Sequence, residues 1–523
     1  MCARVKKLSG HTIATTLFCT VAVALALAGC RTARVAPGTT SASRNATTLT
    51  PGAPGVTPGK AAATQDAPNA TQGAPGVTSG KATSTQDAPN ATQGAPGVTP
   101  SKAAATPGTH TVIPSGAPSV IPSAVEGSLP DTTFTLTLEG EDCRFADHAD
   151  YGIYVPSTAE KIRGIMVFQH GCSQEEFGLS RHHDVQYQAF ARKWDLAIIE
   201  TTIFGLCDVW ARPSEGSYKA LMLALTKAGV RTGHSELANA PLLVWGHSGG
   251  GFWVLSMLHE HPERIIAAIA YSAAWDPQWD YPEAAYEVPI LFRHAGPGEG
   301  ADNIPATARH SFAHLRAHDA PAAIAYTRGQ GHNHSYMRTI TVPFWEAALQ
   351  QRLAPDGSLK PIDRDQSYLV DTISFNIYRA ADFRGESRGL CLLPDYGSAY
   401  AFREFALKGA VRDATPPPAP FDVAIETDGE GNSFLVWRAD ADLESGIGHF
   451  NIYDGDGRLI GRIPEEGLYQ DFDRNGDQAR PVIPPEMKFC LSGNARGPFC
   501  VQTVNRDGLT SEKAVLITPA RKS

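Results

Sequence analysis

The chain of 523 residues lacks any Cys-x-x-Cys pair, although it holds nine cysteines. Paired cysteines at that spacing are the usual signature of a structural zinc site, so we expect neither a metal nor another cofactor. A basic stripe with interleaved aromatic residues is also missing, and the formal net charge is −9. Both features argue against a nucleic-acid partner.

Aromatic side chains are almost absent from residues 30–130, where Ala, Pro, Gly, Thr and Ser predominate. A segment of this composition buries too little apolar surface to offset the entropy lost on ordering, so we expect a disordered linker. Residues 52–57 (Gly-Ala-Pro-Gly-Val-Thr) recur from Gly73 and again from Gly94. These repeats lack the apolar side chains that a stacked solenoid buries, and the linker is expected to act as a semi-extended tether.

The amino terminus does contain an apolar run, at residues 17–27, which follows basic residues at positions 4, 6 and 7. This pattern is typical of a secretory signal peptide and is too short for a membrane span. Residues 27–30 (Leu-Ala-Gly-Cys) resemble a bacterial lipobox, and the likeness implies a signal peptide at residues 1–29 and lipidation of Cys30. Several acyl chains on one residue anchor a protein stably to a membrane. The residue after Cys30 is not aspartate, which favours the outer membrane; an ordinary signal peptide with a fortuitous cysteine is the alternative.

Six cysteines remain once the two in the signal peptide and Cys30 are set aside. An even number in an exported chain is typical of a protein with up to three disulfides. The six are Cys143, Cys172, Cys207, Cys391, Cys490 and Cys500.

Apolar stretches alternate with helix-like stretches over residues 131–412, which we assign to one domain. The expected strands are 162–168, 196–200, 242–245, 265–271, 289–292 and 322–326. Such alternation indicates an α/β fold, a doubly wound and mostly parallel sheet covered by helices on both faces. Catalytic groups on such a sheet belong at the carboxyl ends of the strands.

Ser248 is the candidate nucleophile. It lies in the sequence Gly-His-Ser-Gly-Gly (246–250), after the apolar residues 242–245 and before a helix-like stretch at 252–258. A strand, a sharp turn and a helix form the setting that a nucleophile elbow requires. Glycines on either side of the serine let strand and helix approach closely around a strained turn.

A serine hydroxyl needs an adjacent base, and the base needs an acid that orients it. His332 directly follows the last expected strand and is the candidate base, with His334 as the alternative. Asp302 is the candidate acid, with Glu299 in the same loop as the alternative. The order serine, acid, histidine is that of α/β-hydrolases.

Two backbone N–H groups are expected to form an oxyanion hole. One belongs to Gly249, which follows the nucleophile. For the other we choose Cys172, in the loop after the strand at 162–168.

Three motifs of this domain resemble those of the polyhydroxybutyrate depolymerase and feruloyl esterase group of α/β-hydrolases. They are residues 170–174 (His-Gly-Cys-Ser-Gln), 207–210 (Cys-Asp-Val-Trp) and 246–250. The chain departs from the group at residues 248–251, which read Ser-Gly-Gly-Gly where the group usually has Ser-Ala-Gly-Gly.

The resemblance implies a disulfide between Cys172 and Cys207 that stiffens the oxyanion loop and brings Trp210 into the cleft. We also assign His170 and Trp275 to the substrate pocket. For Trp275, a place in a packed aromatic cluster is an equal alternative. Because the inserted stretch around it is short, we expect no large lid and a cleft that admits bulky or polymeric esters.

A proline-rich stretch at residues 415–420 precedes short alternating strands with turn signals. This spacing indicates a β-sandwich, and residues 413–520 resemble a fibronectin type III domain with Trp437 as its core tryptophan. Cys490 and Cys500 are expected to bridge neighbouring strands. The module is interpreted as adhesive, with a polysaccharide or polymer surface as its partner.

Together these features favour a serine hydrolase of small or polymeric carboxylic esters that works through an acyl-enzyme and is anchored in the cell envelope. A serine peptidase of the same fold is one alternative, but the propeller or large cap that often accompanies such peptidases is not visible. A non-catalytic surface-binding protein is the other, and the intact order of serine, acid and histidine argues against it.

Overall fold

The computed structural model describes residues 131–173, 181–332, 338–469, 484–491 and 497–516. The expected signal peptide, the linker and Cys30 lie outside these residues, as does His334. Among the helices in the described ranges, none is both long and apolar enough to cross a bilayer.

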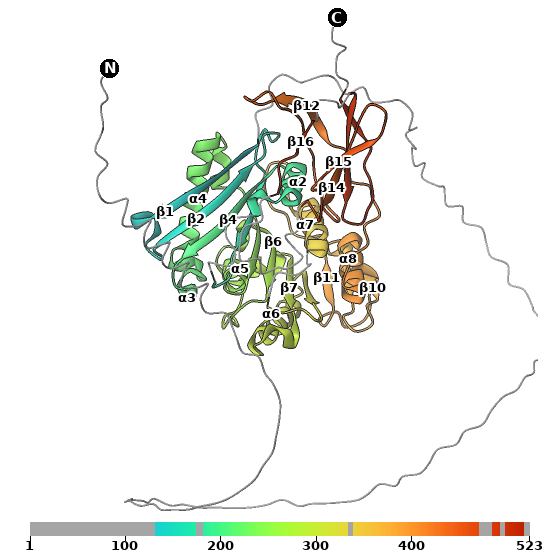
Figure 1. Ribbon diagram of the computed structural model, residues 1–523. Helices are drawn as coiled ribbons and strands as arrows, with labels where there is room; N and C mark the ends of the chain where they lie inside the picture. The colour runs from blue at the N-terminus through green and yellow to red at the C-terminus, as the bar shows by residue number, and fades with distance from the viewer. Residues whose placement is uncertain (1–130, 174–180, 333–337, 470–483, 492–496, 517–523) are drawn as a thin grey trace, which may run out of the picture. The chain divides into compact units, whose positions relative to one another are not determined.

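The largest sheet has eight strands in the order β1-β2-β4-β3-β5-β6-β7-β8 (Figure 1). Strands β3 to β8 are parallel to their neighbours among themselves, whereas β2 runs antiparallel to both β1 and β4. The mixed, mostly parallel sheet confirms the α/β class and matches an α/β-hydrolase fold. Its strands are Thr132–Glu139 (β1), His148–Val155 (β2), Gly164–Gln169 (β3), Leu196–Phe204 (β4), Leu242–His247 (β5), Ile265–Tyr271 (β6), Ile290–His294 (β7) and Ala322–Tyr326 (β8).

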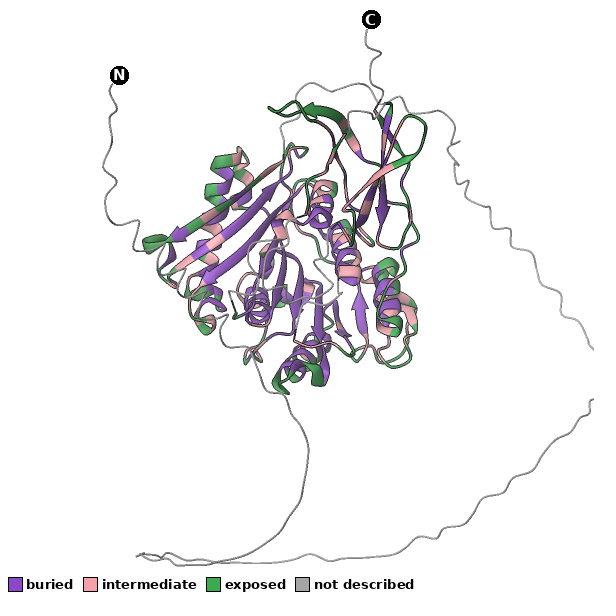
Figure 2. Ribbon diagram, viewed as in Figure 1, coloured by how far each residue is buried: buried purple, intermediate pink, exposed green. Residues whose placement is uncertain are grey.

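Helices cover this sheet. Every residue of β3, β5 and β6 is buried, as expected of parallel strands that are covered on both faces (Figure 2). Trp345 lies fully buried between sheet and helices, with its ring against those of Phe168 and Phe190. The helices are Val185–Trp194 (α2), Cys207–Trp210 (α3), Ser217–Thr232 (α4), Gly249–Glu260 (α5), Asn303–Ala317 (α6) and Arg338–Arg352 (α7).

The parallel register brings the carboxyl ends of neighbouring strands to one edge of the sheet. Gln169 at the end of β3 lies beside Gly246 of β5, and His247 lies beside Tyr271 at the end of β6. The ends of β7 and β8 are likewise paired, His294 with Tyr326. The loops that leave these strands therefore meet, and they carry most of the candidate site residues.

Residues that follow α7 extend the same domain. A small sheet of three strands, in the order β10-β9-β11, precedes α8 (Tyr396–Lys408). Phe402 of α8 and Cys391 of β11 belong to the hydrophobic core of the main sheet. Helix α8 thus packs on the α/β domain. The strands are Tyr368–Val370 (β9), Ile377–Arg379 (β10) and Cys391–Leu393 (β11).

The described carboxy-terminal residues form two further sheets, in the orders β12-β13-β16 and β15-β14-β17-β18. Trp437 is buried in a separate hydrophobic core, where its ring lies 5.3 Å from that of Phe450. The all-β character expected of this region is confirmed. Its strands are Phe421–Thr427 (β12), Ser433–Arg438 (β13), Ile447–Tyr453 (β14), Leu459–Ile463 (β15), Lys488–Cys490 (β16), Phe499–Asn505 (β17) and Ala514–Leu516 (β18).

The expected disulfide between Cys490 and Cys500 is wrong. Both cysteines are free. Cys490 ends β16 in one sheet, whereas Cys500 lies in β17 of the other. The two strands are therefore not neighbours, and the pairing that the prediction required does not exist.

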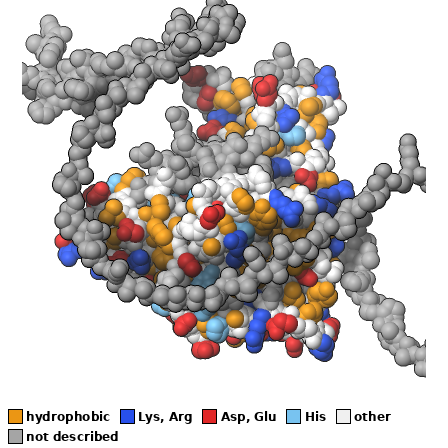
Figure 3. Space-filling view, turned by 90° about the horizontal axis from the view of Figure 1, so that it is seen from below, with side chains coloured by type: hydrophobic (Ala, Val, Ile, Leu, Met, Phe, Trp, Pro, Cys, Tyr) orange, Lys and Arg blue, Asp and Glu red, His pale blue; other side chains and the backbone are white. Residues whose placement is uncertain are grey.

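Charged side chains of both signs are interspersed on the molecular face drawn in Figure 3. No extended area of one charge is visible among the described residues on that face. The acidic balance of the sequence is therefore not concentrated in a single patch there.

Candidate active site

Ser248 occupies a strained turn between β5 and α5. Its φ of 55° and ψ of −115° lie outside the regions that side chains with a Cβ readily adopt. The turn is held by its backbone: Ser248 N donates to Tyr271 O at 2.9 Å, and Ser248 O accepts from Ala274 N at 3.0 Å. A Cβ on Gly246 would clash with Gly250 O, so only glycine permits this approach of strand to helix. These are the features of the nucleophile elbow that the motif predicts.

His332 lies in the loop after β8 and makes a short hydrogen bond to a carboxylate. Its Nδ1 lies 2.7 Å from Oε2 of Glu299, whose side chain is fully buried. The His332 ring also contacts that of His247, the residue before Ser248, with 4.7 Å between ring centroids. The structure thus brings Glu299, His332 and the Ser248 elbow together.

The acid partner of His332 is Glu299 and not Asp302, so that prediction is wrong. A 3₁₀ turn over Gly296–Glu299 follows β7 directly and returns Glu299 to the strand end. Gly300, with a φ of 72°, then redirects the chain, and Asp302 lies exposed at the start of α6. The alternative considered for this loop, Glu299, has the required contact.

The Glu299 carboxylate is held from several directions. Its Oε1 accepts from Ser272 Oγ at 2.9 Å, from Arg293 Nη1 at 3.1 Å and from the N–H of Ala295. Burial raises the pKa of Glu299, but hydrogen bonds from His332 and Ala295 and the charge of Arg293 outweigh it. The pKa lies below its ordinary value as a result, and the carboxylate is ionised at neutral pH.

His247 lies beside this pair but is fully buried. Burial lowers its pKa well below the ordinary value, and the nearby His332, Arg293 and Arg181 lower it further. His247 is therefore neutral under physiological conditions.

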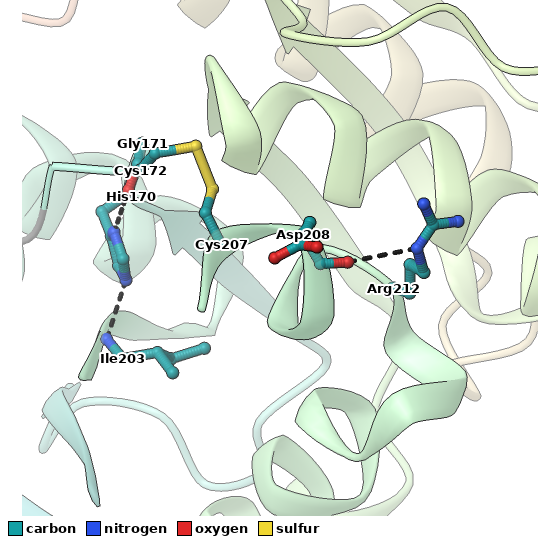
Figure 4. The surroundings of a disulfide bond; sticks show 7 residues. All are labelled: His170, Gly171, Cys172, Ile203, Cys207, Asp208 and Arg212. Atoms are coloured by element: carbon teal, nitrogen blue, oxygen red, sulfur yellow. Dashed lines mark hydrogen bonds between the residues drawn. A yellow bond between two sulfur atoms is a disulfide. The ribbon is translucent and has the colours of Figure 1, made fainter. Parts of the chain in front are cut away.

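The disulfide between Cys172 and Cys207 is confirmed (Figure 4). Both sulfur atoms lie against Gly249: a Cβ there would stand 2.6 Å from Cys172 Sγ and would clash with Cys207 Sγ. In this structure the bridge leaves no room for a methyl group at position 249. The disulfide thus ties the loop after β3 to the first residue of α3 and packs against Gly249, the first residue of α5.

The loop after β3 also reaches Ser248 directly. A Cβ on Gly171 would stand 3.3 Å from Ser248 Cβ. Cys172 is the next residue of this loop. Gly249 is the first residue of α5, and its N–H has no acceptor within the helix. One candidate oxyanion donor thus directly follows Ser248, and the other belongs to the loop that reaches it.

His170 and Trp210 do not line an open pocket, contrary to our assignment. His170 is buried; its Nε2 accepts from Ile203 N at 2.7 Å, and its Nδ1 donates to Gly171 O. Burial lowers the pKa of His170 to about 4. Trp210 is fully buried with its ring 4.7 Å from that of His170. Both side chains pack beneath the loop after β3, inside the protein.

Trp275 is the one aromatic residue assigned to the pocket that is exposed. It follows Ala274, whose N–H binds Ser248 O, and 36% of its surface is accessible. Its ring packs edge-on against Phe252 at 5.3 Å. Trp275 is therefore packed against another aromatic ring and is also exposed near the turn that holds Ser248. Both alternatives considered for it apply.

Sequence reasoning missed Ser272 and Arg293, which hold the acid. Arg293 lies within the apolar strand β7, and its side chain is fully buried. An arginine inside a run of apolar strand residues is an available signal, because buried arginines are rare unless paired. No group of three or more His, Cys, Asp or Glu side chains in the described ranges is placed to hold a metal ion.

No protein-family model matches the chain, and no curated protein matches it. Solved structures similar to it include poly(aspartic acid) hydrolase-1 from Sphingomonas sp. KT-1, with 17% identity over 39% of this chain and 94% of that chain, at a TM-score of 0.31. A ferulic acid esterase has 15% identity over 44% of this chain and 99% of its own, at 0.30. A thermostable esterase has 15% identity over 38% of this chain and 54% of its own, at 0.31. These values are too low to transfer an activity.

Exchange of Glu299 tests the acid. We expect Glu299→Gln to slow the reaction of Ser248 with a fluorophosphonate probe by about 10⁴-fold, because an amide cannot hold His332 in the required tautomer. Asp302→Asn, the matched control, should change the rate by less than about threefold, since the exposed Asp302 side chain makes no cap hydrogen bond. The rate of labelling is measured in each variant, and a larger loss in Asp302→Asn would contradict the assignment.

Exchange of Gly249 tests the packing of the disulfide. Gly249→Ala should slow labelling by about 100-fold or more, because the new methyl group clashes with the sulfur atoms of Cys172 and Cys207 and shifts the loop after β3. The same exchange in a Cys172→Ala/Cys207→Ala background should cost less than about tenfold, since the two sulfur atoms are gone. The labelling rate and the thermal unfolding midpoint are measured for the wild type, for Gly249→Ala, for the double cysteine variant and for the combined variant. Equal losses in both backgrounds would refute the steric explanation.

Proposed function

We propose that this protein is a serine hydrolase of carboxylic esters. The observation that carries the proposal is the hydrogen bond between buried Glu299 and His332 beside the strained turn that holds Ser248. A buried carboxylate, a partly exposed histidine and a serine on such an elbow are the parts of a nucleophilic triad.

In the proposed reaction Ser248 Oγ attacks the ester carbonyl while His332 Nε2 takes its proton. Glu299 stabilises the imidazolium that forms and fixes its orientation. The N–H groups of Cys172 and Gly249 receive the negative charge on the carbonyl oxygen. His332 then gives the proton to the leaving alcohol, and water, activated by the same histidine, releases the acid from Ser248.

The pocket proposed for the substrate lies beside Trp275. Its partly exposed ring, next to backbone bound to Ser248, offers an apolar surface for the acyl or aromatic part of an ester. The carboxy-terminal sheets are proposed to form a fibronectin type III-like module that binds a polysaccharide or polymer surface. This would bring a polymeric ester to the site.

Exchange of the nucleophile tests the activity. Ser248→Ala in the full chain should abolish fluorophosphonate labelling and lower hydrolysis of short-chain p-nitrophenyl esters by about 10³-fold or more. Its thermal unfolding midpoint should remain within about 2 °C, since only a partly exposed hydroxyl is removed. Turnover retained in Ser248→Ala would overturn the proposal. Peptide amides cleaved faster than esters would redirect it to a peptidase, and a folded, unlabelled wild-type chain would favour a binding protein.

The sequence supports a second proposal, that the mature protein is an outer-membrane lipoprotein in which residues 30–130 tether the catalytic domain. Cys30→Ala should shift the protein from the detergent phase to the aqueous phase in Triton X-114 partitioning, because the acyl chains are lost. Mass spectrometry of the amino-terminal peptide should show acylation only in the unmodified chain. An unacylated Cys30 in the exported protein would contradict the anchor.

A further inference from the structure

The buried side chain of Arg293 is the strongest feature that the proposed chemistry does not use. Arg293 lies on β7, and none of its side chain is exposed to solvent. Burial of a guanidinium is unfavourable unless its partners compensate for the lost hydration. The partners of this guanidinium include the carboxylate of Glu299, the candidate acid of the site.

The guanidinium of Arg293 contacts three loops of the site. Its Nη1 donates to Ser272 Oγ at 2.7 Å, in the loop after β6, and to Glu299 Oε1 at 3.1 Å, in the loop after β7. Its Nη2 donates to Gly331 O at 3.0 Å, directly before His332 in the loop after β8. One rigid, planar group therefore sets the spacing of the acid, the base and the loop next to Ser248.

The two carboxylate oxygens of Glu299 have different hydrogen-bond partners. Oε1 is held by Arg293, Ser272 and the Ala295 N–H, which leaves Oε2 directed at His332. The carboxylate cannot rotate without breaking these bonds. The orientation of His332 is thus fixed through Glu299 by Arg293.

The charge of Arg293 has a second consequence. A lone carboxylate beside a histidine favours the imidazolium, whereas a cation on the far side of that carboxylate cancels much of this attraction. Charged or titratable groups near His332 in the described residues include Glu299, Arg293 and His247, and the charge of Arg181 acts on His247. His247 is neutral because burial, with the nearby charges, lowers its pKa. Arg293 is therefore a cation that contacts both the carboxylate and the loop of His332.

We propose that Arg293 is a positioning residue that fixes the acid–base pair, and that its charge lets the site react at lower pH than it would without this charge. The inference rests on the proposed function, because it assumes that His332 acts as the base. It adds a determinant of the pH range in which that base works.

The experiment measures the rate of fluorophosphonate labelling of the full chain between pH 4 and 9. Loss of the cation in Arg293→Gln should move the acid limb of this profile upward by about one pH unit, which lowers the rate on that limb about tenfold. Arg293→Lys keeps the charge but not the planar fork. Its acid limb should stay within about 0.3 units of the wild-type position while its maximal rate falls about tenfold.

Arg352→Gln is the matched control. Arg352 is also buried, but it donates to Ile265 O at the first residue of β6, the end of that strand away from the site. Its loss should lower stability and leave the acid limb unchanged. Should Arg293→Gln not fold, Arg293→Met replaces it as a neutral side chain of similar length.

Two results would overturn the inference. One is a folded neutral variant at position 293 whose acid limb stays at the wild-type position. The other is an equal upward movement in Arg293→Lys, which would exclude the charge as the cause. Failure of the proposed function itself is distinguishable, because then the wild-type chain would not label at Ser248 at any pH.

Discussion

The hydrogen bond between Glu299 and His332 is the interaction on which the candidate site depends. It joins the loop after β7 to the loop after β8, and it requires Glu299 to remain ionised inside the protein. Ser272, Arg293 and the Ala295 N–H meet that requirement by supplying donors to the second carboxylate oxygen. Without them a buried carboxylate would take up a proton and lose its hold on the base.

A second constraint is the close packing of backbone around Ser248. The disulfide, the loop after β3 and the start of α5 approach one another so closely that Gly249 and Gly250 have no space for a side chain. The same closeness places two backbone segments with N–H groups beside the nucleophile. The glycine run is therefore explained by the contacts of this structure, and the disulfide keeps those contacts from loosening.

The sequence predicted the α/β class, the strand–turn–helix setting of Ser248 and the place of His332 after the last strand of the sheet, because each depends on local pattern. The disulfide between Cys172 and Cys207 was implied by the resemblance to a known group. The sequence did not predict the antiparallel strands β1 and β2, whose pairing with β4 is set by tertiary contacts. It placed Trp210 in the cleft, although burial of its ring becomes visible only when the helices are packed. The acid was misassigned for a related reason. Choosing between Asp302 and Glu299 depends on one 3₁₀ turn and a glycine with positive φ.

The buried pair of Arg293 and Glu299 raises the question of what an ion pair inside the protein contributes to such a site. A buried ion pair adds little net stability, because desolvation of both charges offsets their attraction. Here the arginine also binds Ser272 and Gly331, so that removal of either charge would leave the other buried and would disconnect two loops. Arg293 therefore contributes more to the relative positions of the loops than to the free energy of unfolding. A single planar cation fixes three loops relative to one another, which hydrophobic packing of the same volume would do less specifically.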